Sequence, residues 1–153
     1  MILSDKQIFN VVKVVSENST CCSRNVGAVV VDKAGEIIGY GANGICDKVS
    51  TCKDKNECRR RRLGYKSGEA LEQCPGEHAE SKALLMCAKF GLPANGGTMY
   101  ISIPPCERCV LKMYEAGIKT VKVSGEYPQQ VSKPAIELMK ELGINFIIAE
   151  VNE

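Results

Sequence analysis

The chain has 153 residues, a length typical of a single domain. Hydrophobic residues make up 44% of it and charged residues 25%, a composition that excludes a disordered or collagen-like chain. The 20 basic and 18 acidic residues leave a formal net charge of +2, too small for the strong salt-dependent binding of a dedicated nucleic-acid protein. Apolar runs are far shorter than the roughly 20 residues of a membrane span, and no export signal opens the sequence, so we expect a soluble cytoplasmic protein without membrane partners.

The first half of the chain predicts one helix, one hairpin and a long loop. Residues 5–17 carry apolar side chains at helical spacing after the capping candidates Ser4 and Asp5. Residues 26–31 and 36–40, separated by a turn, predict two paired strands. Residues 45–76, here called the Cys-rich loop, show no periodicity but hold four of the nine cysteines and the basic run 59–62. A structureless stretch of this length in a compact domain is usually functional.

The second half alternates helices and strands. Helices are expected at residues 78–90, from Pro104 to about Ala116, and at 134–142, and strands at 99–103, 120–123 and 145–151. The order αββαβαβαβ predicts an α/β fold with a mixed sheet covered by helices on both faces. We expect residues 1–153 to form one domain.

Four residues carry the main chemical signal. His78 is the one histidine of the chain, Glu80 follows two residues later, and Cys106 and Cys109 lie three residues apart at the start of a predicted helix. An imidazole and two thiolates are zinc ligands, and three protein ligands leave the fourth tetrahedral position open, as in catalytic zinc sites. Glu80 points in a different direction from His78 on a helix, so we expect it to act as a general acid and base rather than as a ligand.

His-x-Glu followed by Pro-Cys-x-x-Cys is the signature of zinc-dependent nucleobase deaminases. The chain resembles the cytidine and deoxycytidylate deaminases over roughly residues 7–127, including Cys21-Cys22-Ser23-Arg24, the segment 26–30 and the motif Met99-Tyr100-Ile101-Ser102. The resemblance implies a three-layer α/β/α cytidine deaminase-like fold with a mixed five-stranded sheet. It also implies hydrolytic deamination of a cytosine nucleotide, with deoxycytidylate (dCMP) converted to dUMP and ammonia as the favoured reaction.

The resemblance assigns further roles. Zn²⁺ would be held by His78, Cys106 and Cys109, with Glu80 moving protons. Asn43 would contact the sugar, the Ala79 backbone N–H the pyrimidine carbonyl, and Tyr127 the base. The same family suggests a homo-oligomer. It also suggests a second, structural zinc near the remaining thiols, Cys21, Cys22, Cys52, Cys58 and Cys74.

Other interpretations remain open at the level of sequence. Asn43 lies between glycines and can be a turn residue, and Tyr127 can be a packing residue. The basic run Arg59–Arg62 is either a solvated face or a phosphate-binding element. A deaminase of a base in transfer RNA is the rival enzyme, although the small net charge disfavours it. A non-catalytic zinc module that binds nucleic acid or protein is the rival of another class. Ala42 and Lys82 depart from the aromatic residue and the asparagine usual in the family.

Overall fold

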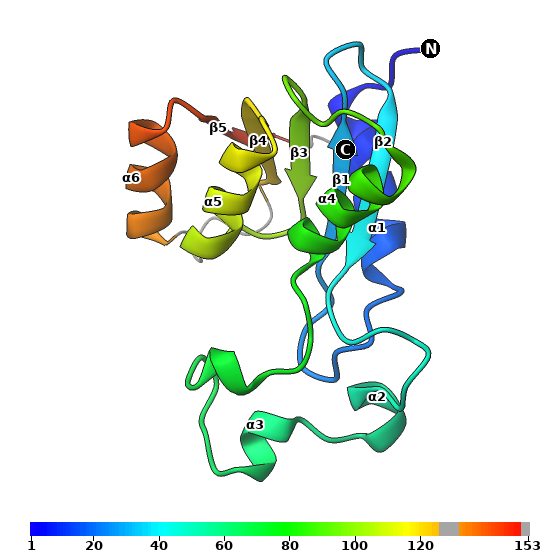
Figure 1. Cartoon of the computed structure of the whole chain (residues 1–153), viewed down its shortest axis with the longest axis vertical. Helices are drawn as coiled ribbons and strands as arrows, with labels where there is room; N and C mark the ends of the chain where they lie inside the picture. The colour runs from blue at the N-terminus through cyan, green and yellow to red at the C-terminus, as the bar shows by residue number, and fades with distance from the viewer. Residues whose placement is uncertain (126–131, 151–153) are drawn as a thin grey trace.

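A five-stranded mixed sheet forms the centre of the computed structural model, which describes residues 1–125 and 132–150. The strand order is β2-β1-β3-β4-β5 (Figure 1). β1 pairs antiparallel with both β2 and β3, whereas β3, β4 and β5 run parallel to one another. The predicted α/β class with a mixed sheet is therefore confirmed. The strands are β1 (Gly27–Val31), β2 (Ile37–Ala42), β3 (Thr98–Ile101), β4 (Thr120–Ser124) and β5 (Asn145–Ala149).

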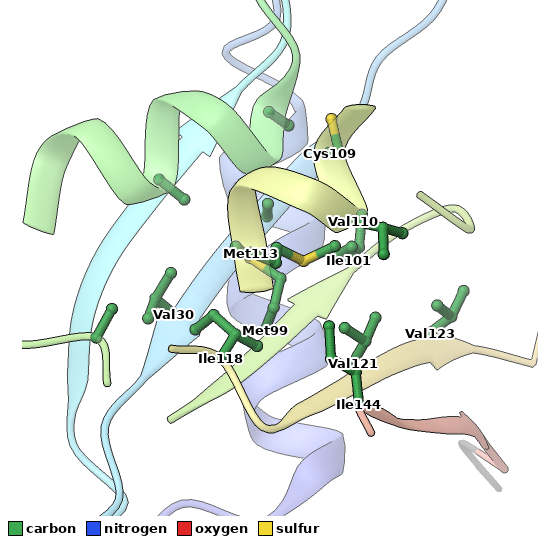
Figure 2. Close-up of a cluster of buried hydrophobic side chains, with 14 of the residues drawn as sticks. Val30, Met99, Ile101, Cys109, Val110, Met113, Ile118, Val121, Val123 and Ile144 are labelled. Atoms are coloured by element: carbon green, nitrogen blue, oxygen red, sulfur yellow. The ribbon is translucent and has the colours of Figure 1, made fainter. Parts of the chain in front are cut away.

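Helices cover both faces of the sheet, as the alternation of side chains requires. Val29 and Tyr100 pack against α1 (Asp5–Ser16), whereas Val30 and Met99 belong to the core cluster on the other face. That second cluster also contains residues of α4 (Ala79–Phe90), α5 (Glu107–Glu115) and α6 (Lys133–Glu141). Figure 2 shows Val110 and Met113 of α5 among the strand residues of this core.

Two glycines in β2 allow α4 to lie close against the sheet. A Cβ atom on Gly41 would be 2.7 Å from the carbonyl oxygen of Ala79, and one on Gly39 would be 2.6 Å from that of Ala83. Only glycine fits such an approach. Because α4 follows His78 and contains Glu80, these glycines set the depth at which the site lies.

The Cys-rich loop is more regular than its sequence predicts. It contains two short α-helices, α2 (Cys52–Lys55) and α3 (Arg59–Arg62), and a 3₁₀ turn, η1 (Leu71–Gln73). Helices of four residues are too short to show a hydrophobic period, so pattern analysis does not detect them. Figure 1 shows α2 and α3 displaced from the sheet, below it in this view.

Local hydrogen bonds order this loop. Thr51 and Asp54 cap α2 reciprocally, and the Lys53 N–H donates to the carbonyl of Thr20. The backbones of Gly44 and Glu77 pair through two hydrogen bonds of 3.0 and 3.1 Å, which bring the two ends of the loop together.

The start of α5 also differs from the prediction. The helix begins at Glu107, with Cys106 as its N-cap, and Pro104 and Pro105 precede it instead of forming its first turn. No helix in the described residues 1–125 and 132–150 is long and apolar enough to span a bilayer.

Candidate zinc site and its cavity

Three ligand-type side chains converge where α4 and α5 begin. His78 is the N-cap of α4, Cys106 is the N-cap of α5, and Cys109 lies in the first turn of α5. The Nδ1 atom of His78 is 3.6 Å from Sγ of Cys106 and 3.3 Å from Sγ of Cys109. Within residues 1–125 and 132–150, this is the one group of three or more His, Cys, Asp or Glu side chains that could hold a metal ion.

These distances fit zinc. A tetrahedral ion with Zn–S bonds of about 2.3 Å and a Zn–N bond of about 2.1 Å separates nitrogen from sulfur by about 3.6 Å. The donor set of one nitrogen and two sulfurs also matches zinc better than the oxygen-preferring magnesium or calcium. The structure therefore brings together the three predicted ligands with room for a fourth, non-protein ligand.

Local electrostatics favour a thiolate at this position. Hydrogen bonds from Cys109 and His78 lower the pKa of the Cys106 thiol to about 3. The same hydrogen bond to Cys106 raises the pKa of Cys109, and the bond between His78 and Cys106 raises the pKa of the imidazole. The N-terminal ends of both helices add partial positive charge, which stabilises anionic sulfur.

Glu80 lies beside the three ligands but is not one of them. It belongs to the first turn of α4 and is only 4% exposed, which is rare for a carboxyl group. Burial raises its pKa, and the charge of His78 opposes that rise. A buried carboxyl group with a raised pKa is suited to accepting and returning a proton near neutral pH.

A cavity of about 430 Å³ opens over these residues. Its lining includes His78, Ala79, Glu80, Cys106 and Asn43. Ala79 is the first residue of α4, so helix geometry leaves its N–H without an intrahelical partner. This N–H therefore has no intrahelical acceptor beside the cavity, which the predicted contact with a pyrimidine carbonyl requires. The cavity volume lies in the range of small-molecule sites.

Asn43 lines the cavity and also organises the backbone beside it. Its Oδ1 atom accepts a hydrogen bond of 2.8 Å from the N–H of Val26, and its Nδ2 atom donates one of 2.9 Å to the carbonyl of Arg24. One lone pair and one N–H hydrogen remain for a ligand. Both interpretations of Asn43, structural residue and sugar contact, are compatible with this geometry. Tyr127 lies outside the described residues.

A polar network behind the ligands was not predicted from the sequence. Lys112 Nζ donates to Ser81 Oγ at 2.7 Å and to Glu77 Oε1 at 3.3 Å, and that same Glu77 oxygen accepts from the His78 N–H at 3.0 Å. Lys112 lies three residues after Cys109, hence on the same helix face, which is the signal that could have indicated its role.

Comparison with known proteins identifies the family. The family model described as "Cytidine and deoxycytidylate deaminase zinc-binding region" matches residues 3–124. The chain belongs to this family. Its members are zinc-binding hydrolytic deaminases, so the predicted family, fold and enzyme class are confirmed at this level.

The sequence identities to individual relatives are modest. The chain is 31% identical to ComE operon protein 2 of Bacillus subtilis over 88% of its own length and 65% of that protein's. It is 26% identical to the deoxycytidylate deaminase of Enterobacteria phage T2, over 95% of this chain and 92% of the phage protein. The chain thus spans about two thirds of the Bacillus protein and nearly all of the phage protein.

Solved structures support the fold. The apo dCMP deaminase from cyanophage S-TIM5 matches with a TM-score of 0.68 and 22% identity, over 97% of this chain and 100% of that one. A structure from work on tRNA:A34 deaminases matches with a TM-score of 0.57 and 16% identity, over 94% and 97% of the two chains. At these identities the likeness concerns the three-layer fold alone.

Proposed function

We propose that this protein is a zinc-dependent hydrolase that deaminates a cytosine nucleotide, converting dCMP to dUMP and ammonia. The observation that carries the proposal is the placement of His78, Cys106 and Cys109 at zinc-ligand distances with the buried Glu80 beside them in one cavity. A structural zinc site has four protein ligands and needs no buried carboxyl group next to them. This arrangement therefore favours an enzyme over a non-catalytic zinc module.

His78, Cys106 and Cys109 would hold the ion, which when bound lowers the pKa of a water molecule and so supplies a nucleophile at neutral pH. Glu80 would take a first proton from that water. It would pass this proton to the ring nitrogen, then take the second proton, from the hydroxyl group now on the ring carbon, and pass it to the amino group that leaves as ammonia. The Ala79 N–H orients the pyrimidine carbonyl, and Asn43 contacts the sugar with its remaining hydrogen-bonding capacity.

The choice of substrate rests on the relatives. Several proteins matched at 26 to 32% identity are named deoxycytidylate deaminase, among them those of phages T2, T4 and D29. The rival substrate, a base in transfer RNA, is represented among the structural matches. The formal net charge of +2 gives little electrostatic attraction for a folded RNA, and this supports the nucleotide.

Ammonia release from a substrate panel tests the proposal. Zinc-loaded protein is incubated with dCMP, CMP, deoxycytidine, deoxyadenylate and unmodified transfer RNA, and Glu80→Gln is measured in parallel. We expect dCMP to be the best substrate and Glu80→Gln to fold and keep zinc while losing about 10²- to 10⁴-fold in kcat. Glu107→Gln is the matched control, because Glu107 is an exposed carboxylate in the first turn of α5 outside the cavity. Full activity of a zinc-loaded Glu80→Gln protein contradicts the assignment.

Other expectations stay predictions. Burial raises the pKa of Cys52, and the nearby thiols of Cys22, Cys21, Cys74 and Cys58 raise it further. In the part of the chain that the structure describes, however, no three of these thiols lie close enough together to share a metal ion. A second, structural zinc is therefore an expectation to be tested.

A homo-oligomer is supported by exposed apolar side chains on α4 and α5, namely Leu85, Leu111 and Tyr114. The single domain over residues 1–153, the role of Tyr127 and the cytoplasmic location also stay predictions.

A further inference from the structure

Three arginines line the cavity that contains His78 and Glu80. Arg60 and Arg61 belong to α3 in the Cys-rich loop, whereas Arg24 precedes β1. They reach the same cavity from segments about 36 positions apart in the sequence. If residues 59–62 only formed a solvated face, there would be no reason for two of them to meet Arg24 at one cavity.

The hydrogen bonds of Arg60 are incomplete. Its Nη1 atom donates to the carbonyl of Glu69 at 2.7 Å, which fixes the direction of the guanidinium group. Its Nε atom is buried and has no hydrogen-bond partner, the one such side-chain atom in the part of the chain that the structure describes. An unsatisfied buried donor is unfavourable, so we expect a ligand to supply an acceptor at this point.

The charges of these arginines are also uncompensated. Among residues 1–125 and 132–150, no ion pair within 4.0 Å involves Arg24, Arg60 or Arg61, whereas the neighbouring Arg62 pairs with Glu57 at 3.7 Å. Two carboxyl groups line the cavity, and neither forms an ion pair with these arginines. Glu77 pairs with Lys112, and Glu80 is buried beside the proposed zinc ligands. The outer part of the cavity therefore presents net positive charge.

We propose that Arg24, Arg60 and Arg61 bind the 5′-phosphate of a nucleoside monophosphate whose base lies at His78 and Glu80. The inference rests on the proposed function and adds the residues that select a nucleotide over a nucleoside. A phosphate monoester carries between one and two negative charges at neutral pH and three acceptor oxygens, and the planar guanidinium group matches these oxygens with paired N–H donors.

Asn43 connects this phosphate subsite to the rest of the site. Its side chain donates to the carbonyl of Arg24 and also lines the cavity, so the residue proposed for the sugar holds the backbone of a residue proposed for the phosphate. The proposed sugar and phosphate contacts are thus joined directly, within the cavity that also contains Glu80. The Cys-rich loop completes the subsite by supplying Arg60 and Arg61.

The test compares two substrates that differ only in the phosphate. Zinc-loaded wild-type protein and the variants Arg60→Met, Arg61→Met and Arg24→Met are assayed with dCMP and with deoxycytidine, and inhibition by inorganic phosphate is measured. The matched control is Arg59→Met, which removes the same charge from the same helix at a residue that does not line the cavity. Thermal melting and zinc content establish that each variant is folded, and Arg60→Lys separates charge from guanidinium geometry.

We expect Arg60→Met and Arg61→Met to raise the KM for dCMP about 10- to 100-fold, the effect of losing one charge-assisted contact, with kcat changed far less. The kcat/KM for deoxycytidine should stay within about twofold, phosphate inhibition should weaken, and Arg59→Met should match the wild type. Arg60→Lys should fall between wild type and Arg60→Met, because it keeps the charge and loses the paired donors.

Distinct results separate this inference from the proposed function. If wild-type protein deaminates neither dCMP nor deoxycytidine, the proposed function fails. Suppose that wild-type protein deaminates dCMP. If the folded Arg60→Met and Arg61→Met proteins lose kcat/KM equally for dCMP and deoxycytidine, or behave as Arg59→Met does, only the phosphate subsite is overturned. Equal kcat/KM values of the wild type for dCMP and deoxycytidine also overturn it. Where deoxycytidine is not measurably turned over, binding of dUMP and deoxyuridine by calorimetry provides the same comparison.

Discussion

Lys112 of α5 and Ser81 of α4 are joined by a hydrogen bond of 2.7 Å between Nζ and Oγ. Ser81 is buried and directly follows Glu80, and Lys112 lies one turn after Cys109. The same ammonium group contacts Glu77, which in turn accepts a hydrogen bond from the backbone of His78. One side chain thus links the two helices that carry the proposed ligands and the proposed proton carrier.

We expect Lys112→Met to weaken zinc binding about 10- to 100-fold, as the loss of groups that orient metal ligands commonly does. The measurement is competition with a chromogenic chelator at fixed pH. Lys112→Arg should restore part of the affinity, since it keeps a charged donor at the same position. Lys140→Met, which removes an exposed lysine from the last turn of α6, is the control. Identical zinc affinities of Lys112→Met and Lys140→Met would show that the link has no positioning role.

Removal of a proposed ligand should remove the metal. Purified protein should contain about one zinc per chain or more, and His78→Ala or Cys109→Ser should lose zinc and deaminase activity together. Cys46→Ser is the control, because Cys46 is an exposed free thiol outside the ligand group. Elemental analysis of the three variants checks the prediction. Well-folded wild-type protein that works without any transition metal contradicts it.

The thiols of the Cys-rich loop should contribute to the order of that loop. We expect Cys58→Ser and Cys74→Ser to lower the melting temperature or the zinc content below the values of Cys46→Ser. Cys46 is the control because its thiol is exposed, whereas the thiol of Cys87 is buried against the carbonyl of Ile38. Negligible effects of both substitutions, on melting and on metal content, would remove the structural-metal hypothesis.

A second polar cluster predicts a pH effect on stability. Asp5 accepts hydrogen bonds from Lys122 at 2.8 and 2.9 Å and from Tyr100 at 2.7 Å. Burial raises the Asp5 pKa, but the hydrogen bonds from Lys122 and Tyr100 and the charge of Lys122 outweigh it and place the pKa below 3.8. The stabilisation is therefore present above about pH 4. This stabilisation is lost as the pH falls through the pKa of Asp5 in the folded protein.

Chemical denaturation between pH 2 and 7 checks this effect. Asp5→Asn should lower the free energy of unfolding at pH 7 by about 1 kcal/mol or less, since the carboxylate is partly exposed. The difference from wild type should shrink toward pH 2. Glu36→Gln, which removes an ion pair of an exposed side chain with the N-terminus, should show neither change. A difference that is constant with pH would assign the effect to packing instead.

The sequence predicts a helix or strand where a hydrophobic period runs through the whole element. It predicts a candidate site where the chemistry requires specific residue types. The strands and the longer helices were predicted to within a few residues, because core positions alternate or recur at helical spacing. His78, Glu80, Cys106 and Cys109 could be proposed from the sequence because zinc deaminases carry these residue types in this order. The position of Arg24 at the cavity and the link from Lys112 to Ser81 could not be predicted, because they depend on distances across the fold.

The Cys-rich loop is the part of the fold that the sequence predicts least well. Thr51 and Asp54 cap a four-residue helix, and Arg60 is oriented by the carbonyl of Glu69. Such contacts leave no period in the sequence. The composition indicated that the basic run could bind phosphate, but only the structure shows which of its members line the cavity.

Both helices at the site begin with a proposed ligand in place of a capping side chain. His78 and Cys106 are the N-caps of α4 and α5, and neither makes a side-chain cap hydrogen bond. A bound ion would therefore join two helix ends that have no side-chain cap of their own. We therefore expect metal binding to stabilise the first turn of α4, where Glu80 is buried, together with the first turn of α5. A chelator should accelerate amide exchange in the first turns of α4 and α5 before the rest of the sheet responds.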